Sequence, residues 1–214
     1  MKQAETSGAD VEAIRDALDD WRTYPELRLP PILAVALEQI GEHGYDATSV
    51  RTIAKELGVT VPALYYHFEN KQAMLVALLD YAMATVHAHA QAALDEAGTD
   101  CVRRLSAVVE SIVLYMAHHS DLAFLDSERR SLTEENRARY FASRDELEGY
   151  LRDAVQSGAQ QGVFTTPHPE ECSRAILSMC QGIATWYRLG GPVPPQAMAE
   201  RYVEIALAAV GYRP

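Results

Sequence analysis

The stretch Thr48–Lys71, TSVRTIAKELGVTVPALYYHFENK, decides the fold. Its first half places apolar residues at i, i+3, i+4 and i+7, the stripe of a short amphipathic helix: Val50, Ile53, Ala54 and Leu57. Gly58 can adopt the positive φ that ends a helix, and the Thr60 hydroxyl can cap a second helix. Two short helices joined by a tight turn form a helix-turn-helix, whose second helix can read DNA.

The second helix of this unit carries an unusual row of rings. Pro62 fits the first turn of this helix, where a missing N–H costs nothing. Val59, in the turn between the two helices, is expected to point inward. A helix this short needs only Leu64 and Phe68 as anchors, which leaves Tyr65–His67 facing outward. Outward-facing rings are not needed to hold the unit together, so the pattern favours DNA binding.

The motif IAKELGV, followed by TVPALYYHF and by NK before an apolar helix, resembles the DNA-binding domain of the TetR (tetracycline-repressor-like) family over residues 30–78. Pro62 stands where many members have Gly, a difference that bears on which bases are read. By resemblance, one set of residues holds DNA phosphates: Thr48, Arg51, Thr60, Tyr66, His67 and Lys71. A second set meets base edges: Val61, Pro62, Ala63 and Tyr65. These roles are chemically reasonable, because small apolar groups suit thymine methyls and hydroxyls or cations suit phosphate oxygens.

Composition limits how the chain can bind DNA. A length of 214 residues with 48% apolar side chains is enough for a substantial core. The net charge of −11 and the pI near 5.0 have the wrong sign for a protein whose whole surface grips nucleic acid. Residues 29–75 carry only three basic side chains against five acidic ones. DNA contact is therefore expected to be local and to depend on two copies of the reader helix spaced along the duplex.

Other classes of protein are disfavoured. The cysteines Cys101, Cys172 and Cys180, without a CxxC motif or a signal peptide, predict a reducing cytoplasm and no disulfide. No run of apolar residues approaches the ~20 needed to cross a bilayer, so no membrane partner is expected. The sequence holds no GxSxG, GxGxxG, GxxxxGK[ST] or HExxH motif, which predicts a protein that is not an enzyme and needs no cofactor.

Histidines raise the question of a metal site. His87 and His89 are two positions apart on a helix and cannot face one ion together. His118 and His119 are adjacent at a helix end, where capping or solvation accounts for them. No metal is expected.

Periodicity predicts an all-α chain in three parts: an N-terminal extension (1–28), a helix-turn-helix domain (29–75) and a helical ligand-binding and dimerisation domain (76–214). The extension has apolar residues at helical spacing: Val11, Ile14, Leu18 and Trp21. Its helix either packs on its own subunit or reaches the dimer partner or the DNA. The first reader helix is expected at 30–43 with four residues inward: Ile32, Val35, Ala36 and Ile40. Thr48 and Asn70 are expected to cap the helices that follow them.

The later helices are expected at about 71–95, 100–118, 121–130, 133–161, 169–189 and 195–210. The turn GGPVPP should fold the last two back as an antiparallel hairpin. Aromatic and flexible side chains on this pair predict a homodimer interface: Trp186, Tyr187, Met198, Tyr202 and Ile205. The TetR family dimerises through its last two helices, which the resemblance extends to this chain.

The segments FLDSERRSLTEENRARYFASRDELEGYLRDAVQSGAQQGVF (124–164) and TWYRLGGP (185–192) resemble the TetR branch that regulates lipid and sterol catabolism and responds to acyl-CoA thioesters. The predicted pocket lining is apolar: Tyr81, Tyr115, Met116, Phe124, Leu125, Tyr140, Phe141, Met179 and Ile183. Cations for a CoA end would come from Arg129, Arg130, Arg137, Arg139 and Arg144. A smaller hydrophobic effector is the alternative, because Arg174 and Arg188 are the only basic residues of the 169–189 helix.

The sequence thus predicts a homodimeric repressor that a small hydrophobic effector releases from operator DNA. The long helix beginning at Lys71 would act as the lever between pocket and reader. The alternatives are a constitutive or architectural DNA-binding protein without a ligand, and a helical interaction adaptor with a vestigial reader.

Overall fold

A computed structural model describes residues 8–213, with side chains from residue 11 onward, and this part of the chain contains helices and no strand. The elements are α1 (Gly8–Asp16), α2 (Pro31–His43), α3 (Val50–Glu56), α4 (Val61–His67), α5 (Lys71–Ala97), α6 (Cys101–His118), α7 (Ser120–Phe124), the 3-10 helix η1 (Leu125–Ser131), α8 (Glu134–Gln160), α9 (Pro169–Trp186) and α10 (Pro195–Ala209). The predicted all-α fold is confirmed. The predicted helix at 121–130 is instead a short α-helix continued as a 3-10 helix.

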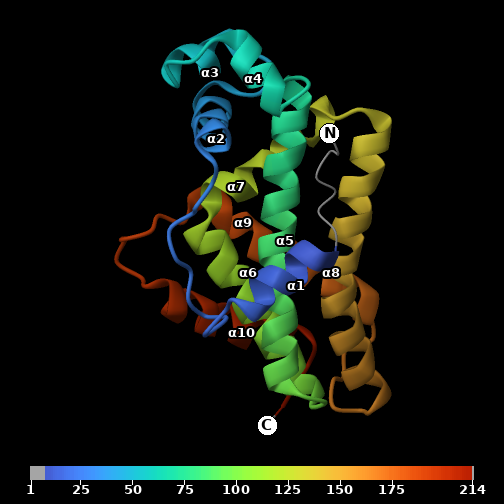
Figure 1. Ribbon diagram of the computed structural model, residues 1–214. Helices are drawn as coiled ribbons and strands as arrows, with labels where there is room; N and C mark the ends of the chain where they lie inside the picture. Colours follow the sequence, from blue (N-terminus) through green and yellow to red (C-terminus); the bar gives the residue numbers. More distant parts are fainter. Residues whose placement is uncertain (1–7, 214) are drawn as a thin grey trace.

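Helix α5 connects the two halves of the molecule (Figure 1). Its N-terminus is capped by Asn70, whose side-chain oxygen accepts from the Ala73 N–H at 2.8 Å, and it ends at Gly98, which has a φ of 68°. By length and composition this helix could cross a bilayer, a property that counting consecutive apolar residues did not reveal. However, 72% of its apolar window is buried inside the fold, as in the core helix of a globular protein.

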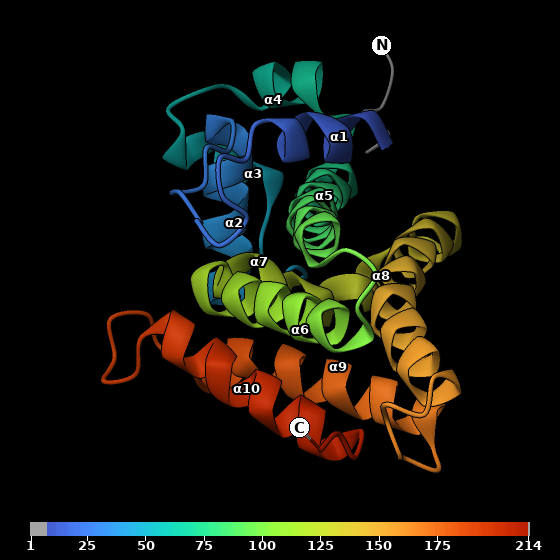
Figure 2. The same cartoon turned by 90° about the horizontal axis from the view of Figure 1, so that it is seen from below.

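Helix α6 lies at the centre of the second half. It packs against α5 on one side and against α9 and α10 on the other, while α8 flanks it (Figure 2). Its inward residues have no exposed surface: Leu105, Val108, Val109, Ile112, Val113 and Leu114. Helix α10 packs chiefly on α6 and only slightly on α9, so the predicted α9–α10 hairpin is held together mainly through a third helix.

The reader, α2 to α4, sits at the N-terminal end of α5 (Figure 1). The inward face of α2 is shifted from the predicted one, since Leu33 and Leu37 are buried while Ile32 and Val35 are only half-buried. The shift arises because this face must contact both α3 and the body of α5. Ala36 and Ile40 are buried as predicted.

The N-terminal extension folds onto its own chain. Helix α1 packs against α5, and Trp21 beyond its end is buried. Of the two interpretations of this helix, packing on its own subunit is the one the structure supports. Residues 1–7, part of the predicted extension, lie outside the described residues.

Candidate nucleic-acid interface and effector site

The turn between α3 and α4 has the predicted glycine geometry. Gly58 has a φ of 67°, and the next N–H, that of Val59, donates to Ala54 O at 2.9 Å. Thr60 caps α4, its hydroxyl oxygen lying 3.4 Å from Ala63 N. Val59 does not point inward as predicted; it is exposed, whereas Leu64 in the following helix is fully buried and anchors the unit.

The cap of α3 is Ser49, not Thr48. Ser49 Oγ accepts from the Thr52 N–H at 3.0 Å. The Thr48 side chain is instead buried, with its hydroxyl 2.9 Å from the carbonyl oxygens of both Gln39 and Gly44. The prediction was wrong because a threonine beside a helix start can also satisfy carbonyls of the preceding helix end.

Helix α4 presents its polar and aromatic side chains to solvent. Leu64 is fully buried, whereas Tyr65 and Tyr66 are 49% and 72% exposed. The exposed set also includes Arg51, Thr60, Pro62, Ala63 and His67, and Val61 is half-buried. The His67 and Tyr66 rings contact edge to face, with centroids 5.3 Å apart. This face has no partner among the described residues large enough to cover it, as a DNA-reading surface requires.

Lys71 is engaged within the protein. Its Nζ donates to Tyr45 O at 2.7 Å and to Thr48 O at 2.9 Å, and it lies 4.0 Å from the centre of the Tyr45 ring. An ammonium has three N–H groups, so a donor remains beyond these two bonds. Lys71 therefore ties the loop before α3 to the start of α5, in addition to any contact it makes with phosphate.

A second link joins the start of α5 to η1 and α8, which belong with α5, α6, α7, α9 and α10 to the effector half of the molecule. Gln72 Oε1 accepts from Asn136 Nδ2 at 2.7 Å and from the Thr133 N–H at 3.2 Å, and its Nε2 donates to Ser131 O. These bonds bind the first turn of α5 to the junction between η1 and α8. A displacement of that junction is thereby passed to the base of the reader.

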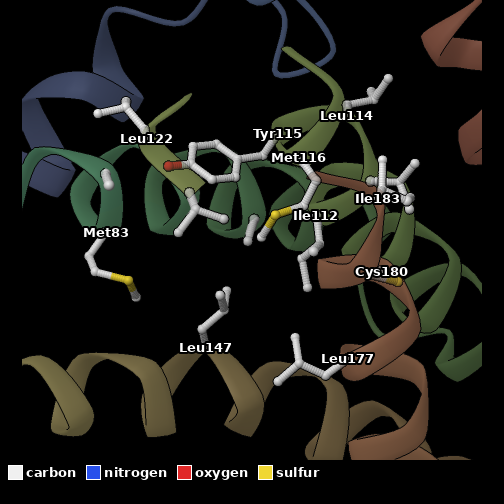
Figure 3. Close-up of a cluster of buried hydrophobic side chains, with 14 of the residues drawn as sticks. Met83, Ile112, Leu114, Tyr115, Met116, Leu122, Leu147, Leu177, Cys180 and Ile183 are labelled. Carbon is white, nitrogen blue, oxygen red and sulfur yellow. The ribbon is translucent and has the colours of Figure 1, made fainter. Parts of the chain in front are cut away.

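The predicted pocket residues do not all gather in one place. Tyr115, Met116 and Ile183 lie in a buried apolar cluster, to which α5, α6, α8 and α9 contribute side chains (Figure 3). The same cluster contains Met83, Leu147 and Leu177. Leu125 and Tyr140 are buried and Tyr81 and Met179 are half-buried. Phe124 and Phe141 are 49% and 40% exposed, so they stand apart from the buried cluster.

Clefts on the surface of the described residues include the following three. The α1 cleft, of about 430 Å³, lies among α1, α5 and α8, and its lining includes Met83, Tyr140 and Arg139. The reader cleft, of about 780 Å³, separates Tyr65–His67 from the start of α8. The α2–α7 groove, of about 800 Å³, is lined by Leu27, Leu37 and Phe124 among others. Met83 belongs both to the α1 cleft and to the buried cluster, so this cleft adjoins the apolar interior.

Three of the arginines that were predicted to supply cations to an anionic ligand are paired with carboxylates. Asp126 accepts from Arg129 at 2.8 Å and from Arg144 at 2.7 Å. Arg139 pairs with Asp80 at 2.9 Å. An anionic ligand would have to exchange with these carboxylates, a requirement that sequence reasoning did not anticipate.

The predicted dimer residues divide into two groups. Trp186 and Ile205 are 52% and 51% exposed, and Tyr202 is half-buried. Tyr187 and Met198 are buried within the subunit, and the Tyr187 hydroxyl donates to Val193 O at 2.7 Å. Tyr187 caps the C-terminal end of α9, and Met198 lies in the first turn of α10, so both are close to the turn at which the chain reverses.

The histidines do not form a metal site in the described part of the chain. His89, His118 and His119 nevertheless meet, because their rings surround Tyr24: the Tyr24 centroid is 4.1 Å from His89, 5.1 Å from His118 and 5.4 Å from His119. The explanation of His118 and His119 as capping or solvated residues missed this packing. No local pattern could have revealed it, since Tyr24 lies far away in sequence.

Comparison with known proteins agrees with this arrangement. Residues 32–78 match the family model for bacterial regulatory proteins of the tetR family, and residues 98–210 match that of the tetracyclin repressor-like C-terminal domain. The transcriptional repressor KstR2 of Rhodococcus jostii is 27% identical over 183 residues, covering 84% of this chain and 89% of the relative. KstR2 of Mycobacterium tuberculosis is 24% identical over 181 residues, covering 84% and 90%.

Solved structures share the fold. A tetR-family regulatory protein from Rhodococcus RHA1 has a TM-score of 0.78 at 29% identity, covering 86% of this chain and 97% of that one. AibR, solved in complex with isovaleryl coenzyme A and operator DNA, has a TM-score of 0.72 at 26% identity, covering 81% and 95%. The C-terminal family model alone spans more than half of the chain, and the chain therefore belongs to the TetR family of bacterial transcriptional regulators.

Proposed function

We propose that the effector of this TetR-family repressor is a hydrophobic acyl thioester whose acyl part binds in the buried cluster around Met83, Met116 and Leu177. The observation that carries the proposal is the convergence of flexible apolar side chains from α5, α6, α8 and α9 on one region (Figure 3). Methionines adapt to irregular shapes, which suits a cluster that must open for a ligand. The relative AibR binds isovaleryl coenzyme A, which supports the same ligand class.

The polar end of the effector would lie in the α1 cleft. Met83 and Tyr140 line this cleft, so an acyl chain entering there reaches the cluster directly. Arg15 and Arg139 are its cations, and Arg139 is paired with Asp80. A ligand phosphate or carboxylate would compete with Asp80 for Arg139, which would loosen α8 from α5.

Operator binding would use α4 from two subunits. Val61, Pro62, Ala63 and Tyr65 would meet base edges in the major groove, and Arg51, Tyr66, His67 and Lys71 would contact phosphates. Exposed Trp186 and Ile205 would hold the homodimer through α9 and α10. Such a protein works in the cytoplasm as a regulator without catalysis or a membrane partner.

The test is release of the protein from operator DNA. An operator is first selected from random duplexes by binding, and the complex is then titrated with acyl-CoAs and with the matching free acids in a gel-shift assay. Thioesters alone should release the DNA. Met116→Trp, which fills the cluster, should raise the thioester concentration needed at least tenfold, whereas Ala138→Trp on the exposed face of α8 should leave it unchanged.

Two outcomes would contradict the proposal. Release by free acids as readily as by thioesters would assign a smaller hydrophobic effector. No release by any compound, together with no rise in melting temperature in a ligand screen, would favour the constitutive DNA-binding alternative, because a ligand that binds the folded state must stabilise it.

A further inference from the structure

A short segment between α1 and α2, the strap Trp21–Tyr24, is bound to both central helices of the effector half. The Trp21 side chain is buried, and its Nε1 donates to Glu96 on α5 at 2.7 Å. His89, also on α5, donates from Nδ1 to Trp21 O at 2.6 Å. The strap is thus fixed to α5 through both a side chain and its backbone.

Arg22 adds ion pairs to both helices. Its Nε donates to Glu110 on α6 at 2.8 Å, and its Nη1 donates to Glu96 on α5 at 3.1 Å. The guanidinium also lies over the Trp21 ring, 3.8 Å from the ring centroid. One side chain therefore connects α5 to α6 across the strap.

Tyr24 completes the attachment to α6. Its hydroxyl donates to Ser111 O at 3.1 Å, and its ring stacks between His89 of α5 and His118 of α6. The stacking fixes the plane of the Tyr24 ring, and the hydrogen bond of its hydroxyl fixes how far the ring extends toward α6. The strap consequently occupies a defined position only while α5 and α6 keep their relative placement.

The chain after the strap leads directly to the reader. Residues 25–30 contain no helix and run along the effector half to α2 (Figure 1). Pro25 and Pro30 restrict the backbone, and Leu27 and Leu29 pack against the core. This linker is therefore short and is held to the core at Leu27 and Leu29, so a shift of the strap is transmitted toward α2.

We propose that the strap is a second connection through which the effector half positions α2, and that Trp21, Arg22 and Tyr24 are positioning residues for operator binding. The reader is then held at both ends, by α5 after α4 and by the strap before α2. A displacement of α6 relative to α5 disturbs the strap, which is bonded to both helices, while the attachment after α4 stays with α5, and α2 therefore shifts relative to α4. The proposal rests on the TetR-family function already established and on no particular effector.

Two variants distinguish a role of the strap in positioning α2 from a role in stabilising the effector half. Inserting Gly-Gly after Pro25 leaves every strap contact in place but adds up to ~7 Å of slack before α2. Arg22→Met removes the ion pairs while keeping most of the aliphatic stem. The control is Arg104→Met, because Arg104 lies on α6, to which Arg22 is bonded, and its guanidinium donates to Gly98 O rather than to the strap.

The readouts are operator affinity, its salt slope, and hydrogen exchange of α2 measured without DNA. Both strap variants should bind operator about tenfold more weakly with an unchanged salt slope, since no phosphate contact is lost. Amide exchange in α2 should rise while that in α10 stays the same. Arg104→Met should match the unaltered protein.

One result overturns the inference directly. If the Gly-Gly insertion binds operator as the unaltered protein does, the strap only stabilises the effector half, whatever Arg22→Met does to the melting temperature. Equal exchange in α2 for all four proteins would lead to the same conclusion.

Discussion

Lys71 shows how one side chain can belong to both the reader's fold and its DNA contact. The resemblance assigns it to a phosphate, yet in the structure it donates to Tyr45 O and Thr48 O. Arg51 has no such internal partner among the described residues and is exposed. The two cations should therefore respond differently to removal.

Lys71→Met should weaken operator binding and also destabilise the free protein by about 1–3 kcal/mol, because two carbonyls lose a charged donor. Arg51→Met should leave the melting temperature unchanged and flatten the salt dependence of operator binding by about one unit. Thermal melts and gel shifts at several salt concentrations measure both. An unchanged melting temperature for Lys71→Met would mean that its internal bonds do not matter in solution.

His119 is a second residue with a measurable consequence. Burial, together with the neighbouring His118 and His89, lowers the pKa of His119 from 6.5 to about 4. Its ring contacts Tyr24 and Tyr115 edge to face. The folded state therefore prefers the neutral ring.

Because the folded pKa lies below the unfolded value, this contribution is present above pH 6.5 and is lost as the pH falls toward 4. The loss amounts to up to about 3 kcal/mol at the acid end. His119→Phe should reduce the fall in stability between pH 6.5 and 4, measured by urea unfolding. The exposed His168→Phe serves as the control, and equal pH profiles for both variants would show that His119 does not titrate as described.

Residue roles were predictable only where the determinant is local. Gly58 and Thr60 behaved as expected because turn and cap geometry depend on adjacent backbone. Thr48 and Val59 did not, since each depends on what other helices leave unfilled. The site roles carried over by resemblance remain predictions.

At the scale of the element, helix α8 depends on one residue without a side chain. A Cβ on Gly158 would overlap the ring of Phe164, which is itself buried. The close approach lets the chain after α8 fold back onto the helix, where Phe164 N–H donates to Gly158 O at 3.1 Å.

Gly158→Ala should destabilise the protein by about 1–3 kcal/mol, because Phe164 must leave its position in the core. Gly41→Ala in α2 is a matched control, since a Cβ there meets nothing within 4 Å. It should be neutral or stabilising by about 0.5–1 kcal/mol, as for most glycines inside helices. Chemical denaturation measures both, and a Gly158→Ala protein as stable as Gly41→Ala would refute the packing.

Helices were the most predictable elements, because a stripe of period 3.6 identifies them without knowledge of partners. Their partners were less so. The turn at GGPVPP suggested that α10 packs on α9, whereas α10 rests mainly on α6. A turn in the sequence predicts that the chain reverses direction, but it does not predict which other helix the two flanking helices pack against.

At the scale of the whole molecule, dimerisation gives the clearest test. Trp186→Arg and Ile205→Glu change exposed side chains, so each subunit should keep its helicity. Both should place an unpaired charge in the proposed interface, at a cost of several kcal/mol, and give monomers that no longer bind operator. Sedimentation and gel shifts provide the measurement.

Phe141→Glu is the control, because Phe141 is also an exposed aromatic but lies on α8. It should remain dimeric. If the Trp186 and Ile205 variants remain dimeric as well, the interface lies on another face.

The largest feature that the sequence did not predict is the attachment of the N-terminal extension. Trp21 fits the helical spacing of the extension but lies beyond the end of α1, and Trp21 and Tyr24 form hydrogen bonds with partners 68 to 87 positions away, which no local pattern reveals. The buried cluster shows the same limit, since Met83, Leu147 and Leu177 join from three helices. Local pattern identifies an apolar face, whereas tertiary packing decides which faces meet.

The small side chains of α5 have a mechanical consequence. Its buried residues include a series of alanines: Ala82, Ala84, Ala88, Ala90, Ala93 and Ala97. Methyl groups offer neighbouring helices only shallow relief, so the alanine-rich stretch resists sliding of α5 along its axis less than the larger buried side chains Met74, Leu75, Leu78 and Leu79 near its start. Directional bonds help to set its axial register, among them Asp80 to Arg139, His87 to Ser143 and His89 to the strap. A ligand that breaks the first of these would let the helix shift lengthwise and carry the reader with it.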